Sequence, residues 1–197
     1  KEVRVLSAEE KIYNQRISVT QRQSALDAKE LAEAGFNGEQ IFEILERVKM
    51  ESSIYITVDT LKFLKKGGRI TPAAAALGTL LRIKPVLQIQ GEKLDSFSKV
   101  RTMKQARAVM LAAAEKDLRE RFADPEAENT WLLVAHTQND EMAAEFAKEI
   151  GEHYPKAGTV YGEPLSLSIA CHIGPGSLAI AMSKKIDIEA ERKRYGL

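Results

Sequence analysis

Apolar runs rich in β-branched residues alternate with amphipathic helical segments along most of this chain. Strand-like runs occupy 53–60 (SIYITVDT) and 130–138 (TWLLVAHTQ), and apolar residues recur at helical spacing over 102–122 and 139–154. Neither an all-helical nor an all-strand architecture accommodates this alternation. The sequence therefore predicts an α/β fold in which helices flank a mixed sheet.

Two further helices are predicted ahead of the first strand. They cover 20–35 and 37–52, with Asn37 as the N-cap of the second, and together they make a helical hairpin. After the first strand, 61–68 is expected to form a short helix, and the alanine-rich segment 71–83 a longer, buried one.

The remaining segments add strands and a tail. A β-hairpin is expected over 84–100, and two strands separated by a turn are expected over 158–185. Residues 187–197 form a highly charged tail whose order the sequence leaves open.

Charge and cysteine content narrow the class of protein. The chain has 29 Lys and Arg against 28 Asp and Glu, so its net charge of +1 gives no electrostatic reason to expect a nucleic-acid partner. Its single cysteine, Cys171, cannot form an internal disulfide, which suits a reducing cytoplasm. No apolar stretch approaches the roughly 20 residues that span a bilayer, so no integral membrane segment is expected.

A cationic, glycine-containing stretch, FLKKGGRITP, holds a candidate anion site. Gly67 and Gly68 precede Arg69, and Thr71 is placed to cap the helix that follows. Free backbone amides at a helix start, together with an arginine, can receive a carboxylate or a phosphate. The alternative is that the glycines only end one helix and that Arg69 is solvated.

A second such stretch, ACHIGPGS, combines a histidine with a tight turn. Gly174 and Gly176, on either side of Pro175, let the backbone pass close to a ligand, and His172 can donate or accept a hydrogen bond near neutral pH. A polar anchor beside an apolar strand suits an amphipathic ligand. The alternative is a turn whose histidine is satisfied by backbone groups. We expect Cys171 to be a small core residue on this strand.

Other polar residues give less specific signals. Arg101 and Lys99 stand between the β-hairpin and the long helix, where they either present a basic contact or are solvated. His136 follows a strand and is expected to be a satisfied turn histidine. The histidines and Cys171 lack the spacing of metal ligands, so neither a metal site nor a cofactor is expected.

Taken together, these stretches resemble a known protein family. The run 58–102, VDTLKFLKKGGRITPAAAALGTLLRIKPVLQIQGEKLDSFSKVRT, is similar to the corresponding segment of DegV-family proteins. ACHIGPGSLAIAM resembles that family's C-terminal His-x-Gly-Pro-Gly signature. The combination covers about 52–184 and is more specific than either glycine turn alone.

The resemblance implies a lipid-binding function. DegV proteins bind one long-chain fatty acid in a tunnel between two α/β lobes, and some serve as carrier subunits of a bacterial fatty acid kinase. By that resemblance the chain would bind a fatty acid as its ligand and present the carboxylate to a separate kinase subunit, which forms an acyl phosphate with ATP. The carrier itself would not be an enzyme.

The resemblance also implies roles for individual residues. Arg69 and Arg101 match positions on the carrier surface near the kinase, and they would contact that partner. The expected lipid-binding residues are His172, Ile173, Gly174, Pro175, Gly176, Ala75, Leu77 and Leu81.

The chain also departs from the family pattern. The first lobe of the family normally begins with a strand that carries an Asp-Ser signature and later presents Ser/Thr loops, and neither is found here. We therefore expect a truncated form, with 1–51 a first-lobe remnant (a strand and the helical hairpin), 52–186 the C-terminal α/β lobe, and 187–197 the charged tail. An apolar face left uncovered in this way would favour a homodimer.

Two other functions remain open at this stage. One is a protein-interaction or regulatory α/β domain that binds no lipid. The other is a hydrolase that uses His172 with Cys171 or Ser177, although no Gly-x-Ser-x-Gly pattern occurs.

Overall fold

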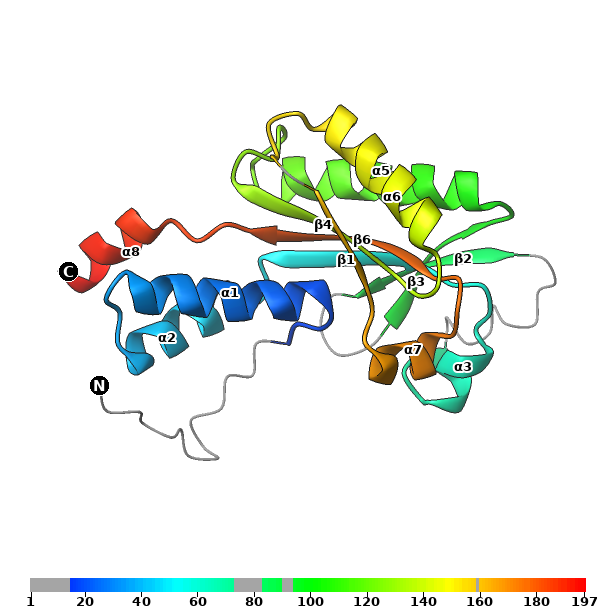
Figure 1. Cartoon of the computed structure of the whole chain (residues 1–197), viewed down its shortest axis with the longest axis horizontal. Helices are drawn as coiled ribbons and strands as arrows, with labels where there is room; N and C mark the ends of the chain where they lie inside the picture. Colours follow the sequence, from blue (N-terminus) through cyan, green and yellow to red (C-terminus); the bar gives the residue numbers. More distant parts are fainter. Residues whose placement is uncertain (1–14, 73–82, 90–93, 159) are drawn as a thin grey trace.

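A six-stranded sheet with the order β3-β2-β1-β6-β4-β5 forms the middle of the protein (Figure 1). The computed structural model describes residues 15–72, 83–89, 94–158 and 160–197. Neighbouring strands are antiparallel except β4 and β5, which pair in parallel, so the predicted mixed sheet is confirmed. The strands are β1 Ser52–Thr57, β2 Lys84–Ile89, β3 Leu94–Val100, β4 Thr130–His136, β5 Tyr161–Pro164 and β6 Leu178–Lys184.

Helices cover both faces of the sheet (Figure 1). α5 and α6 lie on one face, where α5 contacts β1, β2 and β6 and α6 contacts β4 and β5. α1 lies on the other face against β6 and β4, with α2 beside it, and the short helices α3 and α7 pack together on that side. No helix in the described ranges is long and apolar enough to cross a bilayer. The helices are α1 Val19–Glu33, α2 Gly38–Val48, α3 Lys62–Lys66, α5 Met103–Glu120, α6 Asp140–His153, α7 Leu167–Ile173 and α8 Ile188–Tyr195.

The two faces of β6 carry side chains of different size. Successive residues of a strand point to opposite faces, so Leu178 and Ile180 of β6 join the core beneath α5 and α6. Ala179 and Ala181 point instead to the face that α1 covers, and Ala135 of β4 lies on the same face. These short side chains leave space between the sheet and the helices on the α1 side.

The predicted helical hairpin and β-hairpin are confirmed. Asn37 caps α2, because its side chain accepts the backbone N–H of Gln40 while the Gln40 side chain accepts the backbone N–H of Asn37. The expected strand pair over 84–100 is β2 and β3, and its turn lies outside the described residues. Most of the helix expected over 71–83 also lies outside them.

The segment 158–185 differs from the prediction. A helix, α7, separates β5 from β6, where only a turn was expected. Ile169 and Ile173 are four residues apart and line the same cavity, so helical spacing brings both to the sheet side. Cys171 lies on the exposed side of α7, and the prediction of a core cysteine on a strand is therefore wrong.

The charged C-terminal segment forms an ordered helix, α8, that packs on the helical hairpin. The Asp187 side chain accepts the backbone N–H of Ala190 and caps the helix start. The Tyr195 ring meets the Phe36 ring edge-on with centroids 5.9 Å apart, and the Tyr195 hydroxyl lies 2.8 Å from Glu43 Oε2, to which it donates. α8 contacts the helical hairpin, and α1 contacts the sheet. The three predicted segments 1–51, 52–186 and 187–197 therefore pack against one another, and the domain boundaries between them stay predictions.

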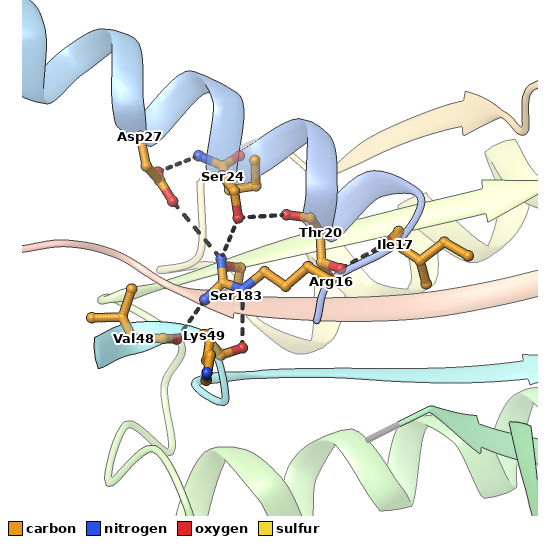
Figure 2. Close-up of polar contacts among 9 residues, drawn as sticks. Arg16, Ile17, Thr20, Ser24, Asp27, Val48, Lys49 and Ser183 are labelled. Atoms are coloured by element: carbon orange, nitrogen blue, oxygen red, sulfur yellow. Dashed lines mark hydrogen bonds and ion pairs between the residues drawn. The ribbon is translucent and has the colours of Figure 1, made fainter. Parts of the chain in front are cut away.

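A buried arginine joins the start of α1 to α2 and β6 (Figure 2). Arg16 Nε donates to the carbonyl oxygen of Lys49 (3.2 Å), and Nη2 donates to that of Val48 (2.8 Å). Arg16 Nη1 donates to the hydroxyls of Ser24 (3.1 Å) and Ser183 (3.0 Å). The side chain is only 1% exposed, so these bonds replace the water that the guanidinium gives up.

Asp27 supplies negative charge to this group of side chains, Arg16, Ser24, Asp27 and Ser183, which we call the Arg16 cluster. Asp27 Oδ2 lies 4.0 Å from Arg16 Nη1, and Oδ1 accepts a hydrogen bond from Gln23 at 2.9 Å. Burial raises the pKa of the Asp27 carboxyl, although the Gln23 hydrogen bond and the Arg16 charge act in the opposite direction. Burial also lowers the pKa of Arg16.

The raised pKa of Asp27 makes its contribution to stability depend on pH. Over the range between the ordinary and the raised pKa, the folded protein holds a proton that the unfolded chain has released, so stability falls as the pH rises through this range. Asp27→Asn removes the titration. We therefore expect the free energy of unfolding of the wild type, relative to that of Asp27→Asn, to fall as the pH rises through this acidic range, measured by urea unfolding.

The exposed Glu33 on the same helix provides a matched control. Glu33→Gln should show a much smaller pH-dependent difference from the wild type over that range. A difference between wild type and Asp27→Asn that is constant with pH would contradict the expectation.

Candidate functional site

A cavity of about 330 Å³ lies on the α1 face of the sheet, between the strands, the start of α1 and the helices α3 and α7. This volume is in the range of sites for small organic ligands. Most of the lining is apolar, which favours a ligand with an apolar body. The apolar lining residues are Ile17, Val19, Ile54, Ile56, Leu64, Ile89, Leu94, Ala135, Leu165, Ile169, Ile173 and Ala179.

Two glycine motifs that are far apart in the sequence meet at one end of this cavity. The His172 ring packs against Gly67, where an added Cβ would lie only 2.8 Å from His172 Nδ1. The Phe63 ring packs against Gly174, where an added Cβ would lie 2.5 Å from the ring. The φ of Gly174 is +80°, a conformation that also favours glycine. The stretches FLKKGGR and ACHIGPG therefore form one structural unit.

A buried threonine holds the Gly-Pro-Gly turn in place. Thr137 Oγ1 donates to the Gly174 carbonyl oxygen at 2.6 Å and accepts the Ser177 backbone N–H at 3.1 Å. The Gly176 backbone N–H donates to the Thr137 carbonyl oxygen at 2.7 Å. Sequence analysis missed Thr137, whose one signal is a polar residue directly after a buried strand.

Cationic side chains lie at the two ends of β6. Arg16 reaches Ser183 near the end of the strand, whereas His172 lines the cavity near its start, where α7 leads into Leu178. Arg69 lines the cavity from the side of β3, where its carbonyl oxygen accepts the Leu94 backbone N–H. The N–H groups of the Arg16 guanidinium already donate to protein oxygens. By contrast, no hydrogen bond or ion pair joins the His172 ring or the Arg69 guanidinium to another described residue. His172 and Arg69 are therefore available as hydrogen-bond donors for an anionic group, and the polar side chains of Gln15 and Ser18 line the cavity as well.

Only some of the predicted lipid-binding residues line the cavity. His172 is half-buried and Ile173 is buried, and both line the cavity. The three residues of the Gly-Pro-Gly turn, 174–176, are not among its lining residues. Ala75, Leu77 and Leu81 lie outside the described residues. The roles of all these residues stay predictions.

The two arginines predicted to contact a partner lie in different surroundings. Arg69 is exposed and also lines the cavity. Arg101 is exposed just before α5, and its backbone N–H donates to Gln105 Oε1 at 3.0 Å. Sequence analysis missed Arg16, because its partners come from segments that no motif connects.

Comparison with known proteins gives the same family from sequence and from fold. The family model described as "Uncharacterised protein, DegV family" matches residues 12–185. A DegV domain-containing protein of Streptomyces coelicolor is 30% identical over 161 residues, which are 82% of this chain and 55% of that protein. The chain spans about half the length of the curated relatives it matches.

Two solved structures share the fold. A DegV family protein from Thermus thermophilus, described as fatty acid binding, superposes with a TM-score of 0.77 at 29% identity, covering 87% of this chain and 59% of that one. DegV of Bacillus subtilis, also described as a fatty acid binding protein, superposes with a TM-score of 0.74 at 29% identity and covers the same shares. The family model's match to residues 12–185, together with this agreement in fold, shows that the chain belongs to the DegV family.

Proposed function

We propose that this chain binds one long-chain fatty acid in the cavity and acts as a carrier without catalytic residues of its own. The observation that supports this most is a largely apolar cavity that is lined also by two unoccupied donors, His172 and Arg69. The description of two structural relatives as fatty acid binding proteins supports the same ligand class.

The two parts of a fatty acid suit the two parts of the cavity. Each methylene that moves from water to an apolar lining contributes about 0.8 kcal/mol, so a long tail gains most from the isoleucines and alanines. The ionised head must find new hydrogen-bond donors when it leaves water. In this proposal His172 and Arg69 provide them, because Arg16 already donates to protein oxygens.

The carboxylate would then be presented to a separate kinase subunit. A carboxylate oxygen attacks the terminal phosphorus of ATP, the bond from that phosphorus to the ADP oxygen breaks, and an acyl phosphate forms while the tail stays in the cavity. Arg69 and Arg101 are both exposed, so either can meet such a partner. The lone, exposed Cys171 is consistent with the cytoplasm as the proposed compartment.

A protein-interaction role is the second candidate, and exposed apolar side chains favour it. Leu167 on α7 is 80% exposed, and Ile17 at the cavity is 43% exposed. Pairing of two chains through this surface would give the homodimer that stays a prediction. The hydrolase alternative gains no such support, because Ser177 is buried and bonded to Thr137 and because neighbouring helical residues such as Cys171 and His172 do not face each other.

Recovery of a fatty acid tests the function, and variants of the head-group residues test the site. Denaturing extraction of the purified protein followed by lipid mass spectrometry should yield a long-chain fatty acid. His172→Ala or Arg69→Ala removes a hydrogen bond to a charged group, worth about 1.5–3 kcal/mol, so we expect palmitate affinity to fall roughly tenfold to a hundredfold. Isothermal titration calorimetry measures the change.

His153→Ala is the matched control, because His153 is exposed on α6 and does not line the cavity. Its palmitate affinity should equal that of the wild type. Failure to recover or bind any fatty acid would contradict the function, whereas wild-type affinity in both site variants would contradict only the assignment of the head group.

The close approach of His172 to Gly67 gives a second prediction. Gly67 has a φ of −81°, which alanine also adopts, so Gly67→Ala tests the contact alone. The added Cβ would displace the imidazole, since it would lie 2.8 Å from Nδ1. We expect palmitate affinity to fall about tenfold, toward that of a variant without the histidine hydrogen bond.

Gly38→Ala at the start of α2 is the control for this substitution, because nothing lies within 4 Å of an added Cβ there. It should bind palmitate as the wild type does. Unchanged affinity in Gly67→Ala would show that the histidine position does not matter for binding.

A further inference from the structure

Arg16 lines the cavity toward Ser183, near the end of β6, whereas His172 lines it toward Leu178, at the start of that strand. Arg16 and Ile54 line this cavity and also a second, much smaller hollow of about 10 Å³. Met50 and Ser52 line the second hollow but not the larger cavity. Arg16 therefore lies where the cavity would otherwise extend along the sheet.

The Arg16 side chain is held in place, because moving it would leave several buried groups without hydrogen-bond or ion-pair partners. The carbonyl oxygens of Val48 and Lys49 would each lose a hydrogen bond from the guanidinium (Figure 2). The buried Asp27 carboxyl would lose its positive neighbour. A flexible apolar tail has no group that could replace these interactions.

The strand register gives the scale of the cavity in this direction. Ala179 of β6 lines the cavity and pairs with Ile56, while Ser183, which Arg16 contacts, pairs with Ser52. The four residues from Ala179 to Ser183 span ~13 Å along an extended strand. A tail that starts at the His172 end and follows β6 therefore reaches Arg16 after a limited length.

We infer that Arg16 is a specificity-determining residue that closes the cavity and limits the length of the acyl chain it accepts. The inference rests on the proposed function, because it takes the carboxylate to lie at His172 and Arg69. The tail runs along β1 and β6, and its methyl end meets the Arg16 cluster. A longer acid leaves methylenes in water or breaks the cluster.

A limit of this kind gives a break in a plot of affinity against chain length. Each further methylene that enters the apolar lining strengthens binding about fourfold. Affinity should rise in this way along the saturated series from octanoic to behenic acid and stop rising once the tail reaches Arg16. Isothermal titration calorimetry with each acid, below its critical micelle concentration, locates the break in the wild-type chain.

Two changes at the closed end should move the break to longer acids. Arg16→Ala combined with Asp27→Asn removes the wall without leaving the carboxylate charge unpaired. Ile89→Ala enlarges the same end without touching the Arg16 cluster, since Ile89 lines both hollows beside Ile54. We expect the break to move by at least one two-carbon step in each variant.

Two matched variants should leave the break in place. Asp27→Asn alone keeps Arg16. Ile169→Ala makes the same isoleucine-to-alanine change at the His172 end, where it weakens binding of all acids without lengthening the path to Arg16.

The outcomes separate the inference from the function on which it rests. Movement of the break in the two closed-end variants, but not in the two matched variants, supports the role of Arg16. An unchanged break in folded Arg16→Ala/Asp27→Asn protein overturns it, and if that variant does not fold, an unchanged break in Ile89→Ala overturns it. A wild type that binds no acid of the series overturns the proposed function itself, and the inference with it.

Discussion

The difference in side-chain size between the two faces of β6 is the constraint on which the rest of the structure depends. β6 gives leucine, isoleucine and methionine to the face beneath α5 and α6, and that face is a closely packed core. The same strand gives only the small residues Ala179, Ala181 and Ser183 to the opposite face. Since α1, α3 and α7 do not fill all of the space, an apolar cavity lies within the second hydrophobic core on that face.

The orientation of an anionic ligand in this cavity depends on which cationic side chains already donate hydrogen bonds to the protein. Arg16 is buried and donates to two carbonyl oxygens and two hydroxyls, so it is part of the framework. His172 and Arg69 also line the cavity, and they bond to no described residue through their side chains. An anionic head group at His172 therefore gains a hydrogen bond that the Arg16 guanidinium does not offer. The tail of such a ligand is then left with the alanine-lined space along β6.

Local sequence patterns predicted those parts of the fold that depend on local physics. The strand at 53–60, the long helix at 102–122 and the Asn37 cap follow from apolar spacing and from a side chain that bonds its own backbone. α7 was missed because its seven residues are too few for a clear helical period, and the neighbouring residues favour strands. The wrong placement of Cys171 follows from the same error.

Contacts between distant segments were beyond the reach of sequence patterns. His172 and Arg69 stood out because glycines surround them, although only the fold shows that both line one cavity. Arg16 carries no local signal, since Val48, Lys49 and Ser183 become its partners only when α1 settles on the sheet. Thr137 likewise acquires its role from the Gly-Pro-Gly turn, which lies in another part of the chain.

The position of the two ends of a bound fatty acid tests the central claim most directly. A crystal structure of the protein with a fatty acid brominated at its terminal carbon locates the tail through the anomalous signal of bromine. We predict a bromine peak beside Arg16, Ile54 and Ile89, with the carboxylate density at His172 and Arg69. A bromine peak beside His172, or a cavity without ligand density at saturating fatty acid, would contradict the claim.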